Sequence, residues 1–183
     1  MTVLSPSVSR LCTSAALAAV ALSLHGGALA QQAAPQAQPA SAVRVERNMS
    51  LQLATQIASA TVAACAANGY AVTATVVDRA GVVRAVQRAD NAGPHTVGAA
   101  ERKAWTSASA KAPTQAMMEN AQKNPGAANL VNIPGFLLLG GGVPVKVGNE
   151  VIGAVGVGGA PGGHLDEQCA NAGLETVKAQ LGG

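Results

Sequence analysis

The chain has 183 residues, of which 49% are hydrophobic, 11% charged and 2% aromatic, and its formal net charge is +3. Abundant aliphatic residues with few charges exclude a largely disordered chain. One Trp, one Tyr and one Phe cannot build a stacking platform for single-stranded nucleic acid, and the basic residues form no run that could follow phosphates. We therefore expect a folded domain with no nucleic-acid partner.

Residues 1–30 have the pattern of a secretory signal peptide. Arg10 supplies the positive charge, an apolar run extends from Leu11 to Leu24, and Ala28-Leu29-Ala30 is a small-x-small cleavage site. The apolar run is shorter than the roughly 20 residues that a membrane-spanning helix needs. We therefore expect a periplasmic or secreted protein with no integral membrane segment after removal of the signal.

Residues 31–42 are rich in Pro, Gln and Ala and show no periodic apolar face, which predicts a flexible linker. The folded domain is then expected over residues 43–183. Its first element is an amphipathic helix from Ser50 to Asn68, because apolar residues recur every three or four positions, Ser50 is a suitable N-cap and Gly69 ends the pattern.

The middle of the domain predicts a hairpin followed by two helices. Residues 71–77 and 82–87 are rich in Val, and turn-forming residues separate them. A loop at 90–94 then leads to an Ala-rich helix over 96–111, and a shorter helix follows Pro113 over 114–123.

The last third predicts three strands, a glycine-rich loop and a helix. The strands are expected over 136–139, 143–147 and 151–157, the last two joined as a hairpin through Gly148-Asn149. The loop covers 158–163 and the helix 165–181. Hairpin-linked strands with helices grouped elsewhere predict an α+β fold, in which a five-stranded antiparallel sheet packs against helices.

The glycine-rich loop, GVGGAPGG, lies between a strand and a helix, where backbone N–H groups could hold an anion. It is not a nucleotide motif, because the Walker Lys-Ser/Thr is missing and Pro161 replaces the third glycine of the dinucleotide pattern. A tight turn with close backbone packing explains the glycines equally well. The two interpretations stay open.

His95 and His164 both stand at predicted helix beginnings, and either could ligate a metal or haem iron. A surface or capping role is the plainer alternative for each. Cys65 and Cys169 fall on the first and last helices, and export would place them in an oxidising compartment. We therefore favour a Cys65–Cys169 disulfide over two buried thiols.

Three segments of the sequence, VTATVVDRAGVVRAVQRADNAGPHT, GGGVPVKVGNEVIGAVGVGGAPGG and HLDEQCANAG, together with the helix ERKAWTSAS, resemble the GlcG/HbpS family of haem-binding proteins. The resemblance covers nearly all of residues 49–181. It implies a profilin-like sandwich with a five-stranded antiparallel sheet, assembly into homo-oligomers, and binding of haem or a related tetrapyrrole in haem handling or redox sensing.

The resemblance also suggests where haem would be held. The GPHT segment and the loop before the last helix supply candidate iron ligands, while nearby basic side chains or glycine N–H groups are available for the propionates. The alternative function is a small accessory or enzyme domain that binds a small carboxylate at the glycine loop. The residues expected at the site are His95, Thr96, Arg102, Lys103, Gly162, Gly163 and His164, with His95 and His164 as the metal ligands.

Overall fold

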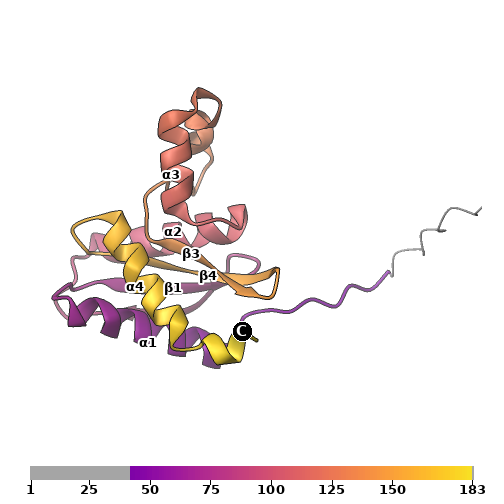
Figure 1. The fold of residues 1–183 in the computed structure, drawn as a ribbon, viewed down its shortest axis with the longest axis horizontal. Helices are drawn as coiled ribbons and strands as arrows, with labels where there is room; N and C mark the ends of the chain where they lie inside the picture. The colour runs from indigo at the N-terminus through magenta and orange to yellow at the C-terminus, as the bar shows by residue number, and fades with distance from the viewer. Residues whose placement is uncertain (1–41, 183) are drawn as a thin grey trace, which may run out of the picture. The chain divides into compact units, whose positions relative to one another are not determined.

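Four strands form one antiparallel sheet in the order β2-β1-β4-β3, and helices cover both of its faces (Figure 1). The computed structural model describes residues 42–182, so the predicted signal peptide and all of the predicted linker except Ala42 lie outside the described residues. The elements in chain order are α1 (Leu51–Ala67), β1 (Thr73–Asp78), β2 (Val83–Arg88), α2 (His95–Ala110), α3 (Thr114–Lys123), the 3₁₀ helix η1 (Pro125–Asn132), β3 (Gly142–Val147), β4 (Glu150–Gly158), α4 (Gly163–Glu175) and the 3₁₀ helix η2 (Lys178–Leu181).

Helices α1 and α4 cover one face of the sheet and enclose the larger apolar core (Figure 1). Helix α1 begins after Ser50, whose Oγ accepts a hydrogen bond from the N–H of Leu53 at 3.2 Å, as the capping pattern predicted. Its buried face contacts alternate residues of β1 and β4, since successive side chains of a strand point to opposite faces. The core residues on these elements are Ala54, Ile57, Ala58, Cys65, Ala74, Val76, Val155 and Val157.

Helix α2 covers the other face of the sheet at unusually short range. A Cβ added to Gly156 of β4 would collide with the backbone of Ala100 and Ala104, and one on Gly158 would lie 3.2 Å from the carbonyl oxygen of Thr96. Small residues on both elements therefore let the helix backbone lie directly on the strand. This close contact fixes the position of α2, on which most of the predicted site residues lie.

The prediction of an α+β fold with an antiparallel sheet flanked by helices is confirmed, but the prediction of five strands is wrong. Residues 136–139 form no strand. Their polar backbone groups bond to helix side chains instead, because Leu137 N–H donates to Thr106 Oγ1 at 2.9 Å and the Leu139 carbonyl accepts from Thr114 Oγ1 at 2.7 Å. With these groups satisfied, the segment has no need of a neighbouring strand.

Two further elements differ from the predicted pattern. Helix α4 ends at Glu175 rather than at Leu181, and the last residues form the separate η2. Helix α3 projects away from the sheet, together with η1, which the sequence pattern did not indicate (Figure 1). Within residues 42–182 there is no helix long and apolar enough to cross a membrane.

Candidate functional site

His95 is the first residue of α2, and its side chain is exposed. The imidazole ring folds back over Gly93, where a Cβ would lie 2.8 Å from Cε1 of the ring. Glycine at this position therefore leaves room for the ring beside the backbone. The side chain is free of any hydrogen bond to the rest of the described residues, so it is available to an external ligand.

Thr96 is buried and its hydroxyl is fully engaged. Its Oγ1 donates to the carbonyl of Gly93 at 2.6 Å and lies 2.7 Å from Oγ1 of Thr73. Because a hydroxyl has a single proton, Thr73 is the donor in the second bond. Thr96 thus fastens the first turn of α2 to β1 and positions its neighbour His95, rather than facing outward.

Arg102 lies seven residues after His95, which is close to two full turns of helix, so both side chains project from the same face of α2. Gly98 and Ala99 lie between them, and no atom comes within 4 Å of a Cβ built on Gly98. The guanidinium of Arg102 is exposed and donates from Nη2 to the carbonyl of Phe136 at 2.8 Å. We call this face of α2 the α2 strip: it consists of the exposed His95, Gly98 and Arg102 and the half-buried Ala99, and it carries an imidazole at one end and a cation at the other.

The glycine-rich loop begins beside the first turn of α2. Gly158 is paired with Thr73 across the sheet, and a Cβ on Gly159 would lie 3.3 Å from Cγ2 of Thr96. Gly159 also has a φ of +132°, a conformation that residues with a side chain rarely adopt. The loop therefore requires glycine for its shape, as the packing interpretation predicted, and it brings the beginnings of α2 and α4 to the same end of the sheet.

Helix α4 begins at Gly163 without a side-chain cap. The N–H groups of Leu165 and Asp166 bond to the carbonyl of Gly162, but those of Gly163 and His164 have no hydrogen-bond partner among residues 42–182. His164 is exposed, and its ring folds over Gly162 as that of His95 folds over Gly93. The beginning of α4 therefore offers two open N–H donors beside an exposed imidazole, which is an arrangement suited to an anion.

Lys103 was predicted to be available for a propionate, but its ammonium group is buried and already paired. Its Nζ lies 2.7 Å from Oδ2 of Asp166 and donates to the carbonyl of Val157 at 2.8 Å. Asp166 Oδ1 in turn accepts the N–H of Ala160 at 3.0 Å. Burial raises the pKa of Asp166, and the hydrogen bond from Lys103 opposes that shift. The pair therefore ties α2, β4 and the glycine loop together from within.

Glu167 is a feature that the sequence pattern did not single out beyond an acidic first turn. Its Oε2 and the Oε1 of Gln115 are buried acceptors with no hydrogen-bond partner among the described residues. Burial raises the pKa of Glu167, and hydrogen bonds from the backbone of Gln115 and Gly141 partly offset the shift. Nothing in the local sequence signals this, because Gln115 and Gly141 meet Glu167 only in the folded chain.

The predicted Cys65–Cys169 disulfide is present and joins α1 to α4, with the two Cα atoms 5.2 Å apart. The two helices lie close together because Gly173 of α4 rests against the backbone of Thr61, where a Cβ would come within 2.9 Å of its nitrogen. No group of three or more His, Cys, Asp or Glu side chains within residues 42–182 could hold a metal ion.

Comparison with known proteins identifies the family. A model described as "Haem degrading protein HbpS-like" matches residues 49–175. The GlcG protein of Escherichia coli is 36% identical over 109 residues, which are 57% of this chain and 80% of that protein. The structure of a double mutant of HbpS from Streptomyces reticuli is 39% identical, with a TM-score of 0.70, covering 79% of this chain and 97% of that one.

Two further structures share the fold. The ORFY protein of Klebsiella pneumoniae has a TM-score of 0.73 and 28% identity, over 78% of this chain and 99% of that one. PduOC, solved as a complex with haem, has a TM-score of 0.63 and 22% identity over 70% of this chain and 94% of that one, so its likeness is one of fold. The match of the family model across residues 49–175 shows that this chain belongs to the HbpS-like family of haem-degrading proteins.

Proposed function

We propose that this protein binds haem on the α2 strip, with His95 toward the iron and Arg102 toward a propionate. The observation that carries the proposal is the placement of an exposed imidazole and an exposed guanidinium on one helix face, about 10 Å apart along the axis. The residues between them, Gly98 and Ala99, have almost no side chain, so a flat ring could lie against the helix.

The residues of the strip fit the chemistry of the group. Haem, when bound, would supply an iron that an imidazole nitrogen can ligate. His95 can turn either ring nitrogen outward because its ring makes no hydrogen bond to the described residues. Arg102 has Nη1 left for a carboxylate, and the open N–H groups of Gly163 and His164 provide a second place for one.

His164 is the alternative iron ligand from this chain, since it is exposed at the same end of the sheet. We assign it the lesser role because its own N–H and that of Gly163 favour an anion beside the ring. We do not include Lys103 in the proposed site, because its ammonium group is buried against Asp166. Thr96 acts through His95, by holding the first turn of α2 in place.

The proposal includes export and self-association. The Cys65–Cys169 disulfide supports an oxidising compartment such as the periplasm or the cell exterior. A second copy of the chain would shield a haem on the α2 strip from solvent. Exposed Val131 and Ile133, which are 57% and 40% exposed, support an assembly that buries the projecting part of the molecule.

A second candidate function is the binding of a small carboxylate at the beginning of α4. The open N–H groups of Gly163 and His164 favour it, because a helix N-terminus attracts anions. Such a ligand would require neither His95 nor the flat surface beside it. Substitutions on the α2 strip should therefore impair haem binding but leave carboxylate binding unchanged.

The experiment is a titration of the full chain with hemin, followed at the Soret band, for the natural protein and Gly98→Leu. The added side chain meets open space, so the variant should fold, but it would stand in the path of the porphyrin. We expect saturable binding by the natural protein and weakened binding by the variant. Stabilisation by acetate or succinate in a thermal melt, without saturable hemin binding, would favour the carboxylate function instead.

A further inference from the structure

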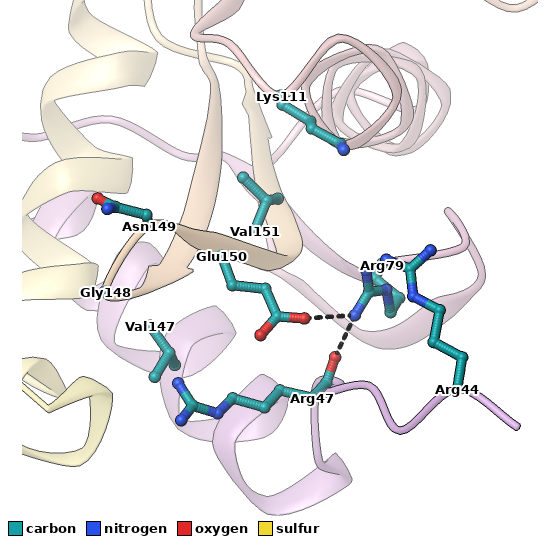
Figure 2. Close-up of a pocket in the computed structure, with 9 residues that line it drawn as sticks. All are labelled: Arg44, Arg47, Arg79, Lys111, Val147, Gly148, Asn149, Glu150 and Val151. Carbon is teal, nitrogen blue, oxygen red and sulfur yellow. Dashed lines mark hydrogen bonds and ion pairs between the residues drawn. The ribbon is translucent and has the colours of Figure 1, made fainter. Parts of the chain in front are cut away.

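A cavity of about 490 Å³ opens at the opposite end of the sheet from the two histidines, between the β1–β2 turn and the β3–β4 turn (Figure 2). Four cationic side chains line it, and they come from three separate parts of the chain. Arg44 and Arg47 precede α1, Arg79 lies in the β1–β2 turn, and Lys111 follows the last residue of α2. Glu150 is the one acidic residue in the lining.

Arg79 is held in place at the edge of this cavity. Its Nη1 donates to Glu150 Oε1 at 2.7 Å and to the carbonyl of Arg47 at 2.9 Å (Figure 2). Its Nε lies 3.2 Å from Glu46 Oε2. Arg79 holds the pKa of Glu150 below its ordinary value. The two N–H groups of Arg79 Nη2 have no partner among residues 42–182. A fixed guanidinium with a free edge is suited to a carboxylate or a phosphate.

Arg47 and Lys111 add two further positive charges beside the Arg79–Glu150 ion pair. Neither side chain forms an ion pair with an acidic group of residues 42–182. Lys111 has a φ of +56° and is the one described residue other than glycine with a positive φ. Glycine is preferred at such a position after a helix, so the chain keeps a lysine there against the backbone preference. The consequence is a cation at the rim of the cavity.

We propose that this cavity binds a small organic anion carrying two or more charges, either a polycarboxylate or a phosphate ester. The four lining cations exceed the single lining carboxylate, and the nearby Glu46 is occupied by Arg44 at 2.7 Å and by Arg79. The volume falls within the roughly 300–1,000 Å³ typical of small-molecule sites. The site is separate from the α2 strip, because Lys111 and His95 stand at opposite ends of α2.

Isothermal titration of the full chain with citrate and, separately, with pyrophosphate tests the proposal. The buffer contains about 10 mM salt, at which the electrostatic screening length is about 30 Å, so salt screens the attraction between the cavity and the anion only weakly. We expect saturable binding of at least one probe. Arg47→Gln and Lys111→Gly should each weaken it by about two- to fivefold, which is the range expected for partly exposed charge contacts.

Lys123→Gln is the matched control, since it removes one positive charge from the end of α3, which projects away from the sheet (Figure 1). Lys111→Gly also relieves the positive φ, so lost binding in that variant cannot be put down to a folding defect. Hemin titration should be unchanged in Lys111→Gly, which separates this site from the proposed haem site. The proposal is overturned if neither probe gives a saturable heat of binding, or if Lys123→Gln weakens anion binding as much as the two site variants do. It is also overturned if the protein sediments with phosphatidylglycerol vesicles but binds neither soluble anion.

Discussion

Lys103 and Asp166 form an ion pair in the interior of the protein, with 2.7 Å between Nζ and Oδ2 and side chains that are only 2% and 4% exposed. The pair connects the middle of α2 to the first turn of α4. The other Asp166 oxygen holds the N–H of Ala160, so the same carboxylate also shapes the glycine-rich loop. The relative placement of the α2 strip and the beginning of α4 therefore depends on this contact.

Lys103→Met should destabilise the protein by about 3–5 kcal/mol at neutral pH, because it leaves a buried carboxylate without its cation. Urea unfolding measures the loss. Adding Asp166→Asn to this variant removes the unpaired charge and should recover part of the stability. If the double variant is no more stable than Lys103→Met at pH 7, the unpaired charge is not the cause of the loss.

Glu167→Gln should become more stable than the natural protein as the pH rises. Burial raises the pKa of Glu167 in the folded state above its unfolded-state value. The neutral carboxyl group therefore contributes stability at a pH below the unfolded-state pKa. This contribution is lost as the pH rises through the folded-state pKa. A glutamine keeps the neutral shape at every pH. We expect the two proteins to have similar urea midpoints in acid and to diverge toward neutral pH, and parallel midpoints across this range would count against the assignment.

Gly156→Ala and Gly98→Ala are the same substitution with opposite expected effects. A methyl group on Gly156 would collide with the backbone of α2, so we expect a loss of about 1–3 kcal/mol. Gly98 lies within α2 with open space beside it, so alanine there should stabilise the helix by about 0.5–1 kcal/mol. Thermal melts of the two variants measure both changes in stability. Equal changes would show that α2 does not lie this close to β4.

Replacing Cys65 and Cys169 together by alanine should lower the free energy of unfolding by about 2–4 kcal/mol, because the disulfide closes a loop with a sequence separation of 104. Urea unfolding of the double variant measures the loss. The natural protein under strong reductant should lose a similar amount. A loss of stability in the double variant with no effect of reductant on the natural protein would mean that the two sulfurs are not joined in solution.

The sequence predicted the helices and hairpins well because each carries its own local signal. Ser50 caps α1 as expected, and the two hairpins stand where Val-rich segments flank turn residues. The prediction of a fifth strand was wrong because residues 136–139 have the composition of a strand, while their hydrogen bonds go to Thr106 and Thr114, which are far away in the sequence. Such side-chain partners leave no local pattern.

The site was predictable in part for the same reason. Residue type and position singled out His95, Arg102 and the glycine loop as candidates. The structure exposes His95 and Arg102 on one face of α2, whereas the loop is only partly exposed. Lys103 could not be separated from Arg102 by sequence, since adjacent residues on a helix point about 100° apart and only the packing of α2 decides which one faces inward. The basic cavity was missed because its arginines and lysine come from distant segments.

The central claim, that His95 is the iron ligand on the α2 strip, is tested most directly by the hemin spectra of His95→Ala and His164→Ala. Both residues are exposed, so neither substitution should impair folding. We predict that His95→Ala weakens hemin binding and shifts the Soret band, while His164→Ala leaves the band in place. An unchanged Soret band and affinity in His95→Ala would contradict the account.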